Sequence, residues 1–161
     1  MHNFEDKRPS KAQIAYEKNE FYEFITGRNG YSVPVIDAQV DVPTDWTRTI
    51  PGIYDLYNET KDDKIIEAFQ DAIRKAINGS CIDIWCACNT LFFHCDHEED
   101  GKTPFIIDKS LRRELRSIVI EKTELLRNTY YGCNKGKSHV YNDILRLNNN
   151  FYDYHGCQLL E

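Results

Sequence analysis

DDKIIEAFQDAIRKAINGSCIDIWCACNTLFFHC, residues 62–95, is the stretch that decides the fold. Between Asp62 and Asn78 the apolar residues fall three and four positions apart, which predicts one face of an amphipathic helix. Gly79 ends that helix, and Ser80 followed three residues later by Asp83 predicts a capping box at the start of a second helix. Apolar residues cover most of residues 81–95, which is typical of a helix buried at the centre of a protein.

The short turn at residues 78–80 predicts an antiparallel helix pair, so the start of the first helix and the end of the second lie at one end. Acidic residues gather there: segments 59–64 and 96–102 carry net charges of −1 and −3, out of −6 for the chain. Acidic residues beyond a helix C-terminus oppose the helix dipole, so stability does not explain the second segment. We therefore expect a surface for a basic partner, formed by Asp62, Asp63, Asp96, His97, Glu98, Glu99 and Asp100. The competing interpretation is a solvated charged loop.

The whole chain has the length and composition of one globular domain, residues 1–161, with 41% hydrophobic residues. Its net charge of −6 argues against nucleic acid or an anionic membrane as the main partner. No apolar run at the N-terminus resembles a secretory signal, so we expect a cytoplasmic protein. The sequence does not determine the oligomeric state.

The other segments also carry mainly helical patterns. Helices are expected over residues 10–26 and from residue 108 or 110 to 128, the latter as the longest in the chain, and a final helix begins after a Ser138 cap. Residues 31–42 predict extended chain with at most one short strand. Residues 44–58 predict a long irregular connection with one short helix near 52–58, and the aromatic residues Trp46 and Tyr54 make it an alternative binding surface.

The expected fold class is therefore mainly α: a helical bundle, or a short HEAT-like helical array, built on antiparallel helix pairs. The C-terminal residues 148–154, polar and then aromatic, are expected to form a tail that packs back on the body.

A metal site is the main chemical alternative, based on Cys86 and Cys88 and on His94, Cys95 and His97. Zinc needs four converging ligands, and Cys86 and Cys88 point about 200° apart around a helix. Cys81, Cys88 and Cys95 lie seven residues apart, about 10 Å along a helix and too far for disulfides with one another. We expect reduced, buried thiols and no cofactor, although a weak metal site near His94 and His97 stays open.

Other catalytic patterns are incomplete. Residues 132–138 end in Gly-Lys-Ser but are one residue short of a phosphate-binding loop and follow a helix. His94 beside Cys95, and His155 near Cys157, are only sequence neighbours. We therefore expect a binding protein and no enzyme. A small metal-dependent enzyme that uses residues 81–97, and a helical adaptor with a different partner, are the alternatives.

The acidic helix end, the segment Gly-Lys-Thr-Pro-Phe-Ile-Ile-Asp at residues 101–108, the long helix after it and the abundant Asn and Tyr resemble bacterial immunity proteins of polymorphic-toxin and contact-dependent inhibition systems. The resemblance covers about residues 50–130. It implies a single-domain inhibitor that binds a cognate toxin domain, often a basic nuclease, in the cytoplasm of the producing cell.

Overall fold

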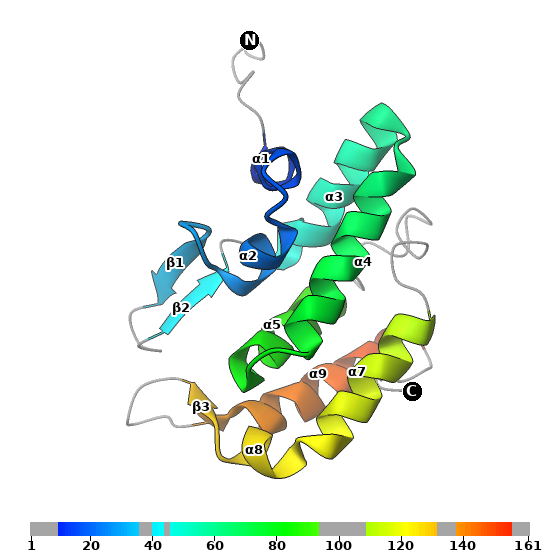
Figure 1. The fold of residues 1–161 in the computed structure, drawn as a ribbon. Coiled ribbons are helices and arrows are strands. Elements are labelled where there is room, and N and C mark those ends of the chain that lie inside the picture. Colours follow the sequence, from blue (N-terminus) through cyan, green and yellow to red (C-terminus); the bar gives the residue numbers. More distant parts are fainter. Residues whose placement is uncertain (1–9, 36–39, 44–45, 94–108, 132–137, 156–161) are drawn as a thin grey trace.

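The protein is mainly helical, as the sequence predicts. A computed structural model describes residues 10–35, 40–43, 46–93, 109–131 and 138–155, which contain eight helices and two pairs of short strands (Figure 1). The helices are α1 (Lys11–Glu17), α2 (Phe21–Thr26), α3 (Trp46–Thr60), α4 (Asp63–Ile77), α5 (Cys81–Phe93), α7 (Lys109–Glu121), α8 (Thr123–Arg127) and α9 (Val140–His155). The strands are β1 (Ser32–Val35), β2 (Val40–Pro43), β3 (Tyr130–Tyr131) and β4 (Ser138–His139).

The predicted hairpin of α4 and α5 forms the centre of the fold. The capping box is confirmed: the Ser80 hydroxyl accepts a hydrogen bond from the Asp83 amide at 3.1 Å, and an Asp83 carboxylate oxygen accepts one from the Ser80 amide at 3.4 Å. Gly79 is required by this close approach, because a Cβ there would lie 2.5 Å from the Asp83 carboxylate. Helix α5 then packs against α2, α3, α4 and α9, which explains its nearly continuous apolar cover.

The N-terminal helix predicted over residues 10–26 is two helices. Ser10 caps α1 by accepting a hydrogen bond from the Gln13 amide at 3.1 Å. The chain then breaks at Asn19, whose positive φ of 58° is a left-handed conformation that asparagine tolerates better than most residues. The break turns α2 so that Phe21, Phe24 and Ile25 are buried, with α2 packed against α4 and α5.

Ser32–Val35 and Val40–Pro43 are extended, as predicted, but they form two strands instead of one. β1 and β2 pair antiparallel, with Val33 opposite Val42 and Val35 opposite Val40. The short helix expected near residues 52–58 is confirmed as part of a longer helix, α3 (Trp46–Thr60), whereas the irregular connection predicted around it is wrong from Trp46 onward. Ile53 and Leu56 of α3 are buried in the core, and this tertiary packing overrides the local helix-breaking signal of Pro51 and Gly52.

The C-terminal part departs from prediction in three places. The helix expected to reach residue 128 is divided at Lys122 into α7 and α8, and α9, with 16 residues, is longer than α7. Ser138 is not a helix cap, since it lies in β4 and the Asn142 amide donates to Nδ1 of His139 at 3.1 Å. The expected tail at residues 148–154 is instead the second half of α9.

One continuous core joins these elements. Leu111, Leu115, Val119 and Leu126 of α7 and α8 are buried, whereas Leu125 of α8 is 60% exposed. Within the described residues, no helix combines the length and the apolar character that crossing a membrane requires.

Candidate binding surface

Two of the predicted binding residues, Asp62 and Asp63, lie at the start of α4. Asp96, His97, Glu98, Glu99 and Asp100 lie outside the described residues, as do His94 and Cys95 of the metal hypothesis. Trp46 is the first residue of α3, and its side chain is also outside the described part of the protein. The predicted meeting of the two acidic segments at one end of the hairpin therefore stays a prediction.

Asp62 has a structural role. Its carboxylate caps α4 by accepting a hydrogen bond from the Lys64 amide at 3.0 Å, and it accepts a second one from the Tyr16 hydroxyl at 3.4 Å. Asp63 is exposed, and a hydrogen bond from the Tyr57 hydroxyl to its carboxylate raises the pKa of Tyr57. The Asp62 carboxylate is therefore used in hydrogen bonds that stabilise the fold, while Asp63 is exposed to solvent.

The structure extends the acidic surface along α3 and α4, beyond what the sequence analysis selected. Five exposed acids belong to it, and we call them the acidic face: Asp55, Glu59, Asp63, Glu67 and Asp71. Residues 55–71 hold six acidic residues against two lysines, a net charge of −4. The signal was available in the sequence, because Asp63, Glu67 and Asp71 are spaced four residues apart and so share one side of α4.

One of the two lysines in this range is engaged locally. Lys61 has a positive φ of 55°, and its ammonium lies 5.6 Å from the centre of the Tyr57 ring and 2.7 Å from the Asn58 side-chain oxygen. These contacts hold Lys61 at the turn between α3 and α4. The acidic side chains farther along α4 are left without its positive charge.

A second polar group lies between α2 and the start of α5 and centres on Asp83. This carboxylate is almost fully buried and accepts hydrogen bonds from the Tyr22 hydroxyl at 2.7 Å and from the Arg28 guanidinium at 2.8 Å. Arg28 also lies over the Tyr22 ring, 5.0 Å from its centre, and Lys75 lies 4.4 Å from the same centre. Burial, followed by the hydrogen bond to Asp83, raises the pKa of Tyr22 to about 12. Each of these side chains contacts another member of the group, so we infer that the group stabilises the fold.

A third group joins α5 to α9. The Trp85 indole donates to the Asp143 carboxylate at 2.6 Å, and Arg146 donates to the other oxygen of Asp143. Asn89 donates to the Trp85 carbonyl at 3.0 Å. Thr90, one residue along, is fully buried, and its hydroxyl has no hydrogen-bond partner among the residues that the structure describes. The interface is thus polar, and all its named groups except the exposed Arg146 are buried.

The cysteines of α5 are free and face different neighbours. Cys86 lies near Asp83 and Arg28, and burial raises the pKa of its thiol to about 12. Burial also raises the pKa of Cys88, which lies near Asp143 on the α9 side. Metal binding needs thiolates, which burial disfavours here. Within the described residues no three His, Cys, Asp or Glu side chains come together as metal ligands.

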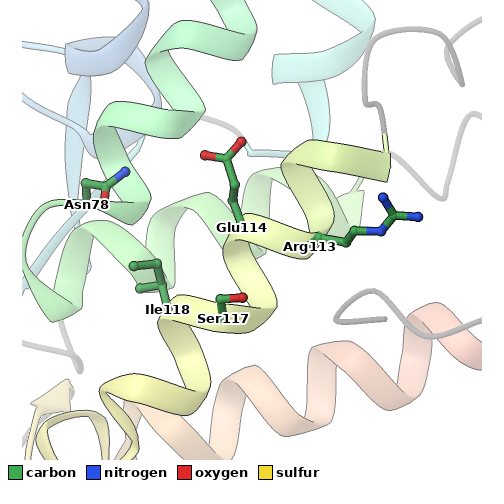
Figure 2. Close-up of a pocket in the computed structure, with 5 residues that line it drawn as sticks. All are labelled: Asn78, Arg113, Glu114, Ser117 and Ile118. Carbon is green, nitrogen blue, oxygen red and sulfur yellow. The ribbon is translucent and has the colours of Figure 1, made fainter.

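An open pocket of about 320 Å³ lies between the end of α4 and α7. It is lined by Asn78, Arg113, Glu114, Ser117 and Ile118, and Figure 2 shows the Arg113 side chain directed away from Asn78. Glu114 is held by an ion pair with Arg74 at 2.9 Å. The lining side chains do not converge on one point, so the pocket lacks the arrangement of a nucleophile, a base and an orienting group.

Comparison of the chain with protein-family models, with curated proteins and with solved structures found no match.

Proposed function

We propose that this protein is a binding protein of the immunity type, which neutralises a basic toxin domain through the acidic face and the acidic residues that follow α5. In this proposal it acts in the cytoplasm of the cell that produces the toxin. The observation that carries the proposal is the exposed row of acids on α4.

The row brings like charges together along α4, although the helix dipole stabilises Asp63 in the first turn. Asp63, Glu67 and Asp71 lie one turn apart, and like charges at this spacing destabilise a helix by about 0.2–0.5 kcal/mol per pair. None of them serves the core, because the buried side of α4 is formed by Ile65, Phe69, Ala72, Ile73, Ala76 and Ile77. A basic partner would relieve the repulsion, and the field of the surface would speed its approach.

The chemistry of the rest of the described surface supports recognition over catalysis. Among the described residues, the groups whose pKa is raised most are Tyr22, Tyr31, Cys86 and Cys88, and none of them lines the pocket. A basic nuclease is the partner class that fits the surface, since a nuclease needs positive charge to hold its own polyanionic substrate.

The test measures association with the product of the adjacent gene, or with a partner recovered by pull-down, at several salt concentrations. A triple variant (Glu59→Gln, Glu67→Gln, Asp71→Asn) should fold as well as the wild type, associate about tenfold more slowly and show a weaker salt dependence. The charge-matched control is Glu17→Gln, Glu121→Gln, Glu124→Gln, which removes three exposed acids elsewhere. Equal rates for both triple variants would reject the acidic face as the binding surface.

The acids after α5 are tested separately. Neutralising Glu98, Glu99 and Asp100 should also slow association, and it should leave stability unchanged or slightly raised, because acids beyond a helix C-terminus oppose its dipole. If neither set of acids affects binding, the search should move to residues 28–60, around Trp46 and Tyr54.

A further inference from the structure

Asparagine followed by glycine occurs twice in the chain, at Asn29-Gly30 and at Asn78-Gly79. In such a pair the side-chain carbonyl carbon of asparagine lies close along the chain to the backbone nitrogen of glycine, and glycine has no Cβ to hinder their approach. Attack of that nitrogen on the carbon slowly removes the side-chain amide, which is one reason why asparagine is a thermolabile residue. The two pairs differ in how the fold holds the attacking nitrogen.

Asn29 and Gly30 are the central residues of the turn that joins α2 to β1 (Figure 1). Their φ angles of 55° and 86° are both positive, and the Tyr31 amide donates to the Arg28 carbonyl at 3.0 Å, a combination typical of a type I′ turn. Both central residues are exposed. The Gly30 amide makes no hydrogen bond within the described part of the chain, so its nitrogen is open to water.

Rotation of the peptide unit between Asn29 and Gly30 brings the reacting atoms together. It converts the turn to type II′, in which the first central residue has a ψ of about −120° and the Gly30 nitrogen faces the Asn29 side chain. The hydrogen bond from Tyr31 to Arg28 that closes the turn is kept. The Asn29 side chain must release Glu20, to which it donates at 2.9 Å on the exposed surface. Because type II′ favours glycine at the first position, the rotated state is a minor one and the reaction is slow.

Asn78-Gly79 has the same sequence but is held by α4. The Gly79 amide donates to the Ala76 carbonyl at 3.0 Å, and the Asn78 side chain donates to the Arg74 carbonyl at 2.8 Å. Attack by the Gly79 nitrogen therefore requires a backbone hydrogen bond to break in addition to the side-chain one. This makes Asn78 an internal comparison for Asn29, with the fold as the difference.

We propose that Asn29 is a site of spontaneous deamidation in the folded protein. The Gly30 nitrogen forms a bond to the side-chain carbonyl carbon of Asn29, the bond from that carbon to the side-chain nitrogen breaks, and ammonia leaves with the proton that Gly30 gives up. Water then opens the resulting cyclic imide at either carbonyl, which gives aspartate or isoaspartate. The reaction needs only water, and the site does not depend on the proposed function.

The product places a second carboxylate against Glu20. In the native protein the Asn29 side chain donates to one oxygen of Glu20 and the Tyr31 hydroxyl donates to the other, each at 2.9 Å. A carboxylate at residue 29 cannot donate, so it repels Glu20 instead. Tyr31 is buried and packs edge-on against Phe24 of α2, and Glu20 precedes the first residue of that helix. Deamidation should therefore weaken the attachment of β1 to α2.

The first test follows both sites in the full-length protein at pH 8 over several weeks, by peptide mapping and mass spectrometry. Asn29 should lose its amide at least about tenfold faster than Asn78 in the native protein. In urea that unfolds the chain, the two rates should become similar, because the Asn-Gly sequence is shared. Loss at Asn29 that is no faster than at Asn78, or a tenfold difference that persists in urea, would overturn the proposal.

The second test uses Asn29→Asp, which supplies one product directly. It should lower the midpoint of urea unfolding by about 0.3 M, and adding Glu20→Gln should restore most of the loss, since one amide and one carboxylate again face each other. The matched control is Asn19→Asp, at an exposed asparagine with a similar φ of 58°, which should not lower the midpoint. A wild-type midpoint for Asn29→Asp, or a loss that Glu20→Gln does not reduce, would refute the predicted effect on stability.

Discussion

Asp83 offers the sharpest test of how the helix pair is attached to the rest of the fold. Its buried carboxylate serves the capping box of α5 and receives hydrogen bonds from Tyr22 and Arg28, which come from the N-terminal part of the chain. Asp83→Ala should lower the free energy of unfolding by about 3 kcal/mol. About 1 kcal/mol of this is the lost helix cap. The remainder is the lost hydrogen bonds to the carboxylate.

The ion pair with Arg28 contributes less than a fully buried pair, because the Arg28 side chain is 45% exposed and regains water when Asp83 is removed. Tyr22→Phe keeps the ring under Arg28 and deletes only the hydroxyl, so it should cost about 1.5 kcal/mol. If the Tyr22 hydroxyl acts through Asp83, Tyr22→Phe should lower the free energy of unfolding by less than about 0.5 kcal/mol when Asp83 is already alanine. The difference between its effects in the two backgrounds, about 1 kcal/mol, is the coupling energy between Tyr22 and Asp83.

The measurement is urea unfolding at pH 7, followed by circular dichroism, for the wild type, both single variants and the double variant. Tyr16→Phe is the matched control, because its hydroxyl donates to Asp62 and not to Asp83. Its effect should add to that of Asp83→Ala within about 0.5 kcal/mol. A coupling below about 0.3 kcal/mol between Tyr22 and Asp83 would refute the argument that this carboxylate links α2 to α5.

Three further outcomes are expected. Thr90→Val should raise the free energy of unfolding by about 1 kcal/mol in the same assay, because it replaces a buried, unpaired hydroxyl by a methyl group, whereas Thr90→Ser should lower it. The pKa values of Tyr22 and Tyr31 are raised to about 12 from an ordinary value of 10, so the protonated hydroxyls stabilise the fold fully below pH 10 and this stability is lost as the pH rises towards 12. Unfolding, followed by circular dichroism, and ionisation of these tyrosines, followed by absorbance at 295 nm, should therefore occur over the same pH range. In native protein at pH 8, Cys86 and Cys88 should resist labelling by a thiol reagent, as mapped by mass spectrometry, while the partly exposed Cys81 reacts; fast labelling of all three would contradict their burial.

Local signals predicted the central helix pair well. The apolar spacing of residues 65–77 and the Ser80–Asp83 capping box depend on residues within one or two helical turns, so the sequence contains the information directly. The acidic row on α4 can also be predicted from the sequence, since Asp63, Glu67 and Asp71 are spaced four residues apart. Its position on the exposed side was implied by the apolar residues opposite.

Only the tertiary structure decided the elements that depend on distant partners. Helix α3 forms across Pro51 and Gly52 because Ile53 and Leu56 are buried in the core, and α2 turns away from α1 because its aromatic side chains pack against α4 and α5. Asp83 reads in sequence as a helix cap, but its strongest contacts are with Tyr22 and Arg28, 61 and 55 residues away. The contacts among Arg127, Tyr130, His139 and Tyr141 likewise join α8, β3, β4 and α9. The sequence alone determines which helices can form, since caps and periodicity act locally, whereas packing decides where they break and which surfaces they expose.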